Sequence, residues 1–203
     1  SRLAEGGVRR VGLIGAVPHT AYDAFRSANP DCSFVDINTE YQLFRLAKSE
    51  DEMVFVRIAS RMNDAAVAAL ADQLRPGLRE YEVAKIIEDV YLAHRAWNLI
   101  HFSLTTPMTH PQVCVPHQYH PDRVLESGDV FVTEISTTFW GYAGQILRTF
   151  TIAADPTPLY QNLHEVAMEA YLGIIDAMRP GVTVGEVLDA AEVISRAGYD
   201  IWD

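Results

Sequence analysis

The residues Arg75-Pro76-Gly77-Leu78, followed by Glu82-Val83, return later in the chain as Arg179-Pro180-Gly181-Val182, followed by Glu186-Val187. Both parts of the second copy lie 104 residues after their counterparts in the first copy. This spacing is too long for a solenoid unit, because solenoid repeats are roughly 20–50 residues long. The repeat therefore predicts two half-domains that pack around a pseudo-two-fold axis.

Helical patterns flank both copies of this phrase. Ser49 and Glu52 predict a capping box, in which each residue satisfies a backbone amide of the other at the start of a helix. Gly198 is typical of the residue that ends a helix. Apolar residues recur at helical spacing in four segments, about 49–74, 80–94, 158–178 and 184–197.

The segment between the two helix pairs has the pattern of strands. We expect strands at about 98–104, 112–116, 130–136 and 141–153, with a hairpin around Trp140. The second helix pair ends near Asp203, where its matching strands should begin. The order predicts an α+β fold in which helix pairs cover one face of a curved antiparallel sheet. We expect its second half to be truncated, so that any site built from both halves is incomplete in this chain.

The first residues have a different pattern. Two short buried strands, at about 8–15 and 33–36, flank a helix at about 21–28. This order is typical of the end of an α/β domain. We therefore expect residues 1–45 to be the C-terminal remnant of such a domain plus a linker, and residues 46–203 to be an incomplete catalytic domain.

Composition excludes several classes of partner. The net charge of −11 disfavours nucleic acid and anionic membranes, because both attract basic surfaces. No run of 18 apolar residues predicts a membrane span. Cys32 and Cys114 are the only cysteines, which fits a reducing compartment and predicts a cytoplasmic protein. Gly12 and Gly15 lack the third glycine and the acidic residue of a dinucleotide fingerprint.

The stretch from Val115 to Phe150 holds the polar residues that could carry chemistry. Glu134 lies in a strand of β-branched and aromatic residues, where a carboxylate is costly to bury unless it is paired or metal-bound. Two interpretations stay open. Glu134 is an exposed residue or the ion-pair partner of Arg148, or it is a carboxylate of a functional site.

His117 is the histidine that we select as a candidate acid or base. It follows Pro116, which fixes the local backbone, and other polar residues cluster nearby. We interpret His110 and His120 as solvent-facing residues. His117 and His120 are three residues apart, but on an irregular stretch that sets no geometry, so the histidines alone do not predict a metal site.

Several motifs occur here in combination, over roughly residues 45–203. They are Pro116-His117, Pro121-x-Arg123-x-Leu125-x-x-Gly128-Asp129-Val130, Gly141-Tyr142, Arg148-Thr149-Phe150, Lys48-Ser49-x-x-Glu52, Ala197-Gly198-Tyr199 and the repeated Arg-Pro-Gly phrase. Together they resemble the pita-bread-fold enzymes, which include aminopeptidase P, prolidase, methionine aminopeptidase and creatinase. The resemblance implies two pseudo-symmetric halves, each of two helices and strands, around a curved antiparallel sheet.

The resemblance also implies where metal ligands would lie. Peptidases of this family bind two metal ions through two aspartates, a histidine and two glutamates. The first aspartate corresponds to Glu134, seven residues before Gly141, and the second to Gln145, three residues after Tyr142. The other ligands would lie beyond Asp203. Because a neutral amide bridges two dications poorly, we expect either no cofactor or one divalent ion (Mn, Co or Zn), held in part by Glu134.

Creatinase implies a chemistry for such a site, because it keeps the fold and works without metal. It uses a histidine that corresponds to His117 as acid and base on a C–N bond of a guanidino substrate. The resemblance thus implies a hydrolase acting on a C–N bond of a small polar molecule or short peptide. His117 and Glu134 would be catalytic, and Gln145, Arg148 and Tyr142 would contact the substrate.

Two alternatives to this function stay open. One is an Xaa-Pro dipeptidase or aminopeptidase with a modified metal site. The other is a catalytically dead module that binds peptides or proteins. Relatives of the creatinase and prolidase type form homodimers, so a homodimer is expected by analogy.

Overall fold

The computed structural model describes residues 2–118 and 121–200 of the chain. It contains two compact units, Ser1–Val54 and Phe55–Asp203. The division falls inside the helix α4 (Glu50–Gln73), whereas the sequence predicts a domain boundary before this helix, between residues 45 and 46. A continuous helix thus leads from one unit into the other.

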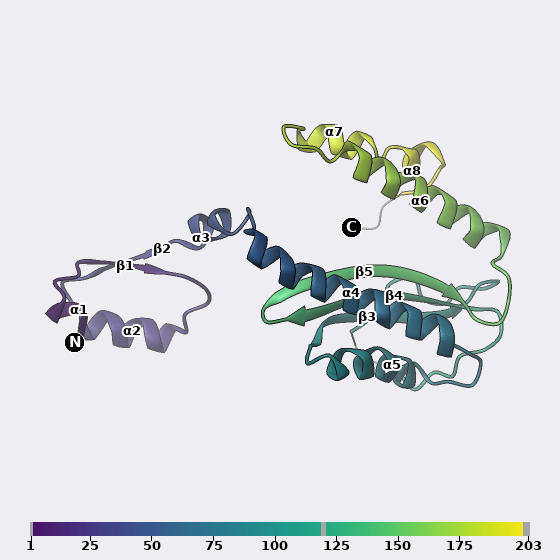
Figure 1. Ribbon diagram of the computed structural model, residues 1–203, viewed down its shortest axis with the longest axis horizontal. Coiled ribbons are helices and arrows are strands. Elements are labelled where there is room, and N and C mark those ends of the chain that lie inside the picture. The colour runs from purple at the N-terminus through teal and green to yellow at the C-terminus, as the bar shows by residue number, and fades with distance from the viewer. Residues whose placement is uncertain (1, 119–120, 201–203) are drawn as a thin grey trace. The chain divides into compact units, whose positions relative to one another are not determined.

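The first unit is a small β-α-β arrangement (Figure 1). Its elements are α1 (Arg2–Glu5), β1 (Arg10–Leu13), α2 (His19–Ala28), β2 (Ser33–Asp36) and α3 (Asn38–Phe44). β1 and β2 pair in parallel, with Arg10 opposite Ser33. Tyr22 of α2 packs edge-on against Phe34 of β2, with ring centroids 5.9 Å apart. The expected strand–helix–strand order is confirmed, and both strands are four residues long.

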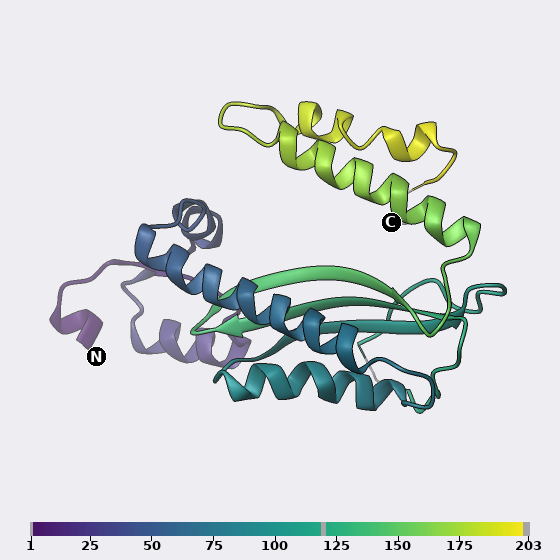
Figure 2. The ribbon, with the colours of Figure 1, turned by 45° about the vertical axis from the view of Figure 1, so that its right-hand side comes forward.

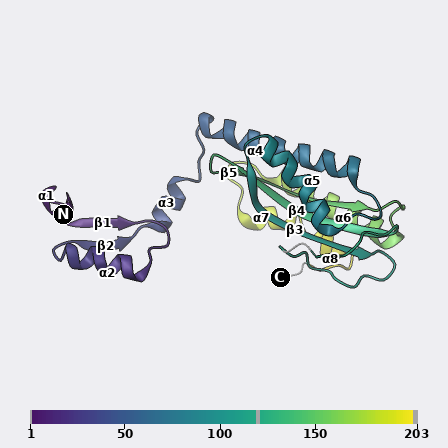
Figure 3. The same ribbon diagram turned by 90° about the horizontal axis from the view of Figure 1, so that it is seen from below.

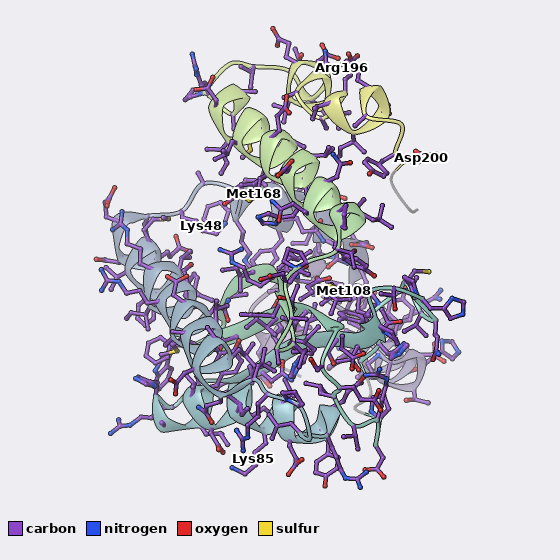
Figure 4. All side chains as sticks on the ribbon, turned by 90° about the vertical axis from the view of Figure 1, so that its right-hand side faces the viewer. Lys48, Lys85, Met108, Met168, Arg196 and Asp200 are labelled. Carbon is purple, nitrogen blue, oxygen red and sulfur yellow. The ribbon has the colours of Figure 1, made fainter. Side chains whose placement is uncertain are left out.

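The second unit begins with a helix pair that covers one face of a sheet (Figures 1 and 3). The elements are α4, α5 (Glu80–Ala93), β3 (Trp97–Pro107), β4 (Asp129–Phe139) and β5 (Tyr142–Thr151). The strands are antiparallel in the order β3-β4-β5. Lys85 projects from α5 on the side away from the sheet (Figure 4). The polar side of this helix therefore faces solvent, while its apolar side packs inward.

The predicted helix start and hairpin are both confirmed. The Ser49 amide donates to Glu52 Oε2 at 2.8 Å, and the Glu52 amide donates to Ser49 Oγ at 3.3 Å. Trp140 and Gly141 have φ values of 52° and 84° and form the two-residue turn between β4 and β5. Two consecutive left-handed residues match the right-handed twist of the flanking strands, which is why such turns close hairpins.

The repeated phrase folds into the same local structure twice. Gly77 and Gly181 have φ values of 92° and 95°, so each turns the chain in a conformation that glycine adopts readily. The first copy continues into α5, which begins three residues after Gly77, and the Arg79 amide donates to Glu82 Oε2 at 2.8 Å. In the second copy the Thr183 amide donates to Glu186 Oε2 at 2.7 Å, and this bond lowers the pKa of the Glu186 carboxyl.

The core lies between the sheet and the helices α4 and α5. Side chains alternate along a strand, so Phe131 and Ile135 of β4 share the helix-facing side with their β5 partners Phe150 and Ile146. The buried cluster consists of Met62, Ala66, Leu70, Val83, Ile87, Tyr91, Ala96, Leu125, Phe131, Ile135 and Ile152. The intervening residues of β4, among them Glu134, lie on the other side, which we call the Glu134 face.

The segment 112–116 does not form the strand that the sequence predicts. Only His117, just after it, pairs with β3, in an isolated bridge to Ser103. Pro111 precedes the segment and Pro116 ends it, and neither has an amide hydrogen to donate, so a ladder cannot continue through them. The prediction of a strand here was wrong.

The single helix predicted at 184–197 is also wrong, because the chain forms α7 (Val184–Asp189) and α8 (Val193–Arg196) instead. Between them the Ala191 amide bonds to the Leu188 carbonyl at 2.9 Å, which is the tighter spacing of a 3₁₀ turn. The predicted stop at Gly198 is confirmed. Its φ is 82°, and the Tyr199 amide reaches back to the Ile194 carbonyl at 3.1 Å.

The second helix pair is far less buried than the first. α6 (Pro158–Ala177) packs on α7 and α8 (Figure 2). Ala170 is the buried residue of these three helices, and Leu172 and Ile175 stay 57% and 46% exposed. No strand follows α8 within residues 2–200. None of the helices in the described part of the chain combines the length and the apolar character that crossing a bilayer requires.

Replacement of Gly144 by alanine should destabilise the second unit. Gly144 of β5 lies against α4, and a Cβ there would come within 2.7 Å of the Ser60 amide nitrogen and 2.8 Å of the Ala59 carbonyl carbon. Both atoms belong to the helix backbone, so helix and strand must separate, at a cost of about 1–3 kcal/mol. Urea unfolding measures this loss.

Gly185→Ala is the matched control, because a Cβ there would meet only Thr183 Oγ1 at 3.8 Å and alanine favours a helix. An unchanged unfolding midpoint for Gly144→Ala would contradict the close approach of α4 and β5.

Candidate functional site

Glu134 and Gln145 come together on the Glu134 face. Glu134 lies opposite Phe102 of β3 and Leu147 of β5, and Gln145 lies opposite Ser136. The two residues are therefore diagonal neighbours on adjacent strands, within reach of one another. Gln145 Nε2 donates a hydrogen bond to Glu134 Oε1 at 2.5 Å. Glu134 is half-buried and Gln145 is exposed.

This pair offers few ligand atoms to a metal ion. It contains one carboxylate and one neutral amide, and the amide nitrogen is turned toward Glu134. Divalent cations in a two-metal centre need bridging carboxylates and several further oxygen or nitrogen ligands. No group of three or more His, Cys, Asp or Glu side chains in the described residues could hold an ion. Glu134 and Gln145 together do not fit a two-metal centre. Glu134 could contribute a ligand to a site for one ion.

His117 is held by its backbone at the free edge of β3. The Ser103 amide donates to the His117 carbonyl at 3.0 Å, and the His117 amide donates to the Ser103 carbonyl at 2.9 Å. Ser103 pairs with Thr133 of β4, and Thr133 directly precedes Glu134. His117 and Glu134 are therefore one residue apart in the register of the sheet, with β3 between them. Directly opposed residues share a face, so this register assigns His117 to the helix-facing side with Ser103 and Thr133, opposite the Glu134 face.

The other two histidines of this region carry less information. His110 is exposed, as the sequence predicts, and its amide closes a turn onto the Pro107 carbonyl at 3.3 Å. His120 lies outside the residues that the structure describes.

Arg148 and Tyr142 lie on the helix-facing side of β5. Arg148 is opposite Thr133, and its guanidinium donates to the Leu147 carbonyl at 2.7 Å. The Tyr142 ring stacks on Phe55 of α4, with centroids 5.5 Å apart. The period of two along a strand thus separates both residues from Glu134. Among the described residues, the ion pairs do not include one between Arg148 and Glu134.

A polar cluster on the helix-facing side of β3 was not predicted from the sequence as a unit. Arg123 makes a two-pronged ion pair with Asp129, at 2.7 and 2.9 Å, and donates to Thr105 Oγ1 at 2.7 Å. Glu80 Oε1 accepts from the Thr105 amide at 3.1 Å and from the Thr105 hydroxyl. We call these four residues the Arg123 network. Hydrogen bonding to Asp129 raises the pKa of Arg123, so the guanidinium stays charged.

Two members of the Arg123 network belong to the motif Arg123-x-Leu125-x-x-Gly128-Asp129, which is a signal that the sequence did contain. Glu80 had no such signal, because an acidic residue in the first turn of a helix is common for reasons of the helix dipole alone. A hollow of about 230 Å³ also lies near the end of α5, lined by Glu88, Tyr91, Leu92, Trp97 and Asn98. No predicted site residue lines it.

Known proteins share this architecture. The chain is 25% identical over 190 residues to an Xaa-Pro dipeptidase of Pyrococcus furiosus, which covers 93% of this chain and 54% of that protein. The crystal structure of an X-Pro aminopeptidase from Thermotoga maritima superposes with a TM-score of 0.85 at 24% identity, covering 98% of this chain and 56% of that one. The dipeptidase PepE of Mycobacterium ulcerans superposes with a TM-score of 0.77 at 26% identity, covering 93% and 50%.

These matches establish the fold. The chain has the α+β pita-bread fold that the motifs imply, and it spans about half the length of the relatives that it matches. The profile of metallopeptidase family M24 matches residues 55–201, which is most of the chain and nearly all of the second unit. On this match the chain belongs to metallopeptidase family M24.

Proposed function

We propose that the protein is a hydrolase that cleaves a C–N bond in a small polar substrate or a short peptide. Membership of family M24 and the relative named Xaa-Pro dipeptidase support a peptidase-like hydrolase. The observation that carries the proposal is the hydrogen bond between Gln145 and Glu134. It joins the two positions at which the resemblance implies metal-bridging carboxylates, and it leaves one carboxylate instead of two.

The proposed chemistry runs without metal or with one ion. A two-metal mechanism clamps two cations about 3.5–4 Å apart between shared anionic ligands. Gln145 carries no charge, so the pair with Glu134 has half the negative charge that two carboxylates would supply. If one Mn, Co or Zn ion is bound, Glu134 contributes a ligand, and the ion would polarise the bond to be cleaved.

His117 is the proposed general acid and base. Hydrolysis of a C–N bond needs a group that takes a proton from water and gives one to the leaving nitrogen, and histidine performs both near neutral pH. Glu134 has one carboxylate oxygen, Oε1, bonded to Gln145, so we assign Oε2 to a cationic or N–H group of the substrate. Gln145 holds that carboxylate in place. Arg148 and Tyr142 have no part in the proposal, because the Arg148 guanidinium bonds to the Leu147 carbonyl and the Tyr142 ring stacks on Phe55.

Two other functions each rest on a specific observation. The name of the Pyrococcus furiosus relative favours an Xaa-Pro dipeptidase with a modified metal site. The replacement of both aspartate positions, by Glu134 and Gln145, favours a module that binds peptides without cleaving them. A homodimer and a cytoplasmic location stay predictions, the first by analogy and the second from cysteine content.

His117→Ala should reduce turnover to a small residual rate. Loss of a positioned acid or base lowers kcat by about 10²–10⁴-fold. The assay panel contains Xaa-Pro dipeptides, N-substituted amino acids and guanidino compounds, each followed by release of the amine. His110→Ala is the control, because His110 is exposed. If His117→Ala leaves kcat unchanged, His117 is not the acid and base. If the wild type binds peptides without turnover, the non-catalytic module is favoured.

Gln145→Asp should raise the number of metal ions bound per chain. The substitution returns a second carboxylate beside Glu134, and bridging carboxylates are what a pair of dications requires. Metal content measured by mass spectrometry, after dialysis against Mn²⁺ or Zn²⁺, should be at most one ion for the wild type and higher for the variant. Gln145→Asn keeps the neutral amide and should leave the content unchanged. Two ions in the wild type would refute the metal-poor site.

A further inference from the structure

The loop that carries His117 lies between β3 and β4, and three of its described residues, Gln112, His117 and Arg123, bond to β3. Thr106 Oγ1 accepts from the Gln112 amide at 2.8 Å. Ser103 exchanges both backbone hydrogen bonds with His117, at 3.0 and 2.9 Å. Thr105 Oγ1 accepts from Arg123 Nη1 at 2.7 Å. All three anchor residues belong to β3, so this strand holds one side of the loop.

The fastening at Arg123 involves two buried carboxylates. Glu80 and Asp129 are 2% and 1% exposed, and Arg123 lies between them with its guanidinium on Asp129 and Thr105. The backbone is fixed as well, because the Glu80 amide donates to the Arg123 carbonyl at 3.0 Å. The Leu125 amide donates to the Leu78 carbonyl at 2.8 Å. The end of the loop is therefore locked to the start of α5.

The charge balance of this cluster points to a geometric role. It contains two carboxylates, Glu80 and Asp129, and one guanidinium, and Glu80 Oε2 is buried with no hydrogen-bond partner among the described atoms. An unbalanced buried cluster is an inefficient source of stability, because apolar residues of similar size usually stabilise a core as well or better. What such a cluster supplies is a defined arrangement, since each member has a required direction.

We propose that the Arg123 network positions His117. Ser103 and Thr105 are two residues apart on β3, so they lie on the same side of the strand and hold the loop at His117 and at Arg123. The isolated bridge to Ser103 ties the His117 backbone to the sheet. Arg123 is thus a positioning residue that acts through the loop. The proposal rests on the function proposed above, because that function is what gives the position of His117 a consequence for rate.

Hydrogen exchange of single amides tests the anchoring without reference to activity. Thr105→Val removes the hydroxyl that links Arg123 to Glu80 and keeps the size of the side chain. The His117 and Ser103 amides should exchange at least about tenfold faster, while the Ile135 amide of the core keeps its rate. Thr137→Val is the matched control, because Thr137 is fully buried and its hydroxyl donates to the Trp97 carbonyl, away from the loop.

Two outcomes of this measurement would overturn the anchoring. Equal acceleration of the His117, Ser103 and Ile135 amides in Thr105→Val would show that the network serves stability alone. Unchanged exchange at His117 would show that its bridge to Ser103 needs no support from Arg123.

Kinetics of Arg123→Lys tests whether the anchoring matters for catalysis. Lysine keeps the charge but cannot make the two-pronged bond to Asp129, so kcat should fall at least about fivefold with little change in KM. In a His117→Ala background the same substitution should cause no further loss, since it acts through His117. Arg79→Lys is the control, because Arg79 pairs with the exposed Asp122 of the same loop.

The two proposals fail in different ways. An equal loss from Arg123→Lys with and without His117 would refute the positioning role. Full activity of His117→Ala would instead refute the function proposed for His117, while hydrogen exchange would still decide whether the Arg123 network holds the loop.

Discussion

The contact between α4 and β5 at Gly144 determines which side of the sheet becomes the core. The helix backbone at Ala59 and Ser60 leaves no room for a side chain at Gly144, so helix and strand meet almost backbone to backbone. Because side chains alternate along a strand, this one contact assigns every residue of β5, and through the ladder every residue of β4, to one face or the other. Phe131 and Ile135 become core, and Glu134 is left on the opposite face, free of the apolar cluster.

The two copies of the repeated phrase separate local from tertiary effects. Both turn at a glycine with a positive φ, and both close a carboxylate onto a backbone amide three residues earlier. The helices that follow nevertheless differ. α5 runs without a break and buries Val83 and Ile87 against the sheet, whereas the matching segment divides into α7 and α8 with no buried residue. Packing on a sheet stabilises a long helix, and the turn chemistry at its start does not by itself maintain its length.

The site combines residues of very different sequence separation. Glu134 and Gln145 are joined across a hairpin whose two-residue turn fixes the register, so their proximity follows from local rules. The same register puts Arg148 and Glu134 on opposite faces of the sheet. Counting residues outward from the two-residue turn at Trp140 and Gly141 would have predicted this separation from the sequence. The position of His117 depends instead on a loop of irregular structure. The proposed roles of Glu134 and His117 therefore depend on two kinds of order, one set by a hairpin and one by the buried Arg123 network.

The sequence by itself determined the helix start at Ser49, the stop at Gly198, the hairpin at Trp140 and the α+β order, because each is set by residues a few positions apart. Its motifs also indicated the family, which the match over residues 55–201 established. Only the tertiary structure decided that 112–116 is no strand, that Glu80 meets Arg123 and Asp129 around Thr105, and that α7 and α8 are separate. These features depend on contacts between segments distant in sequence, and short-range preferences contain no information about which distant groups will be close.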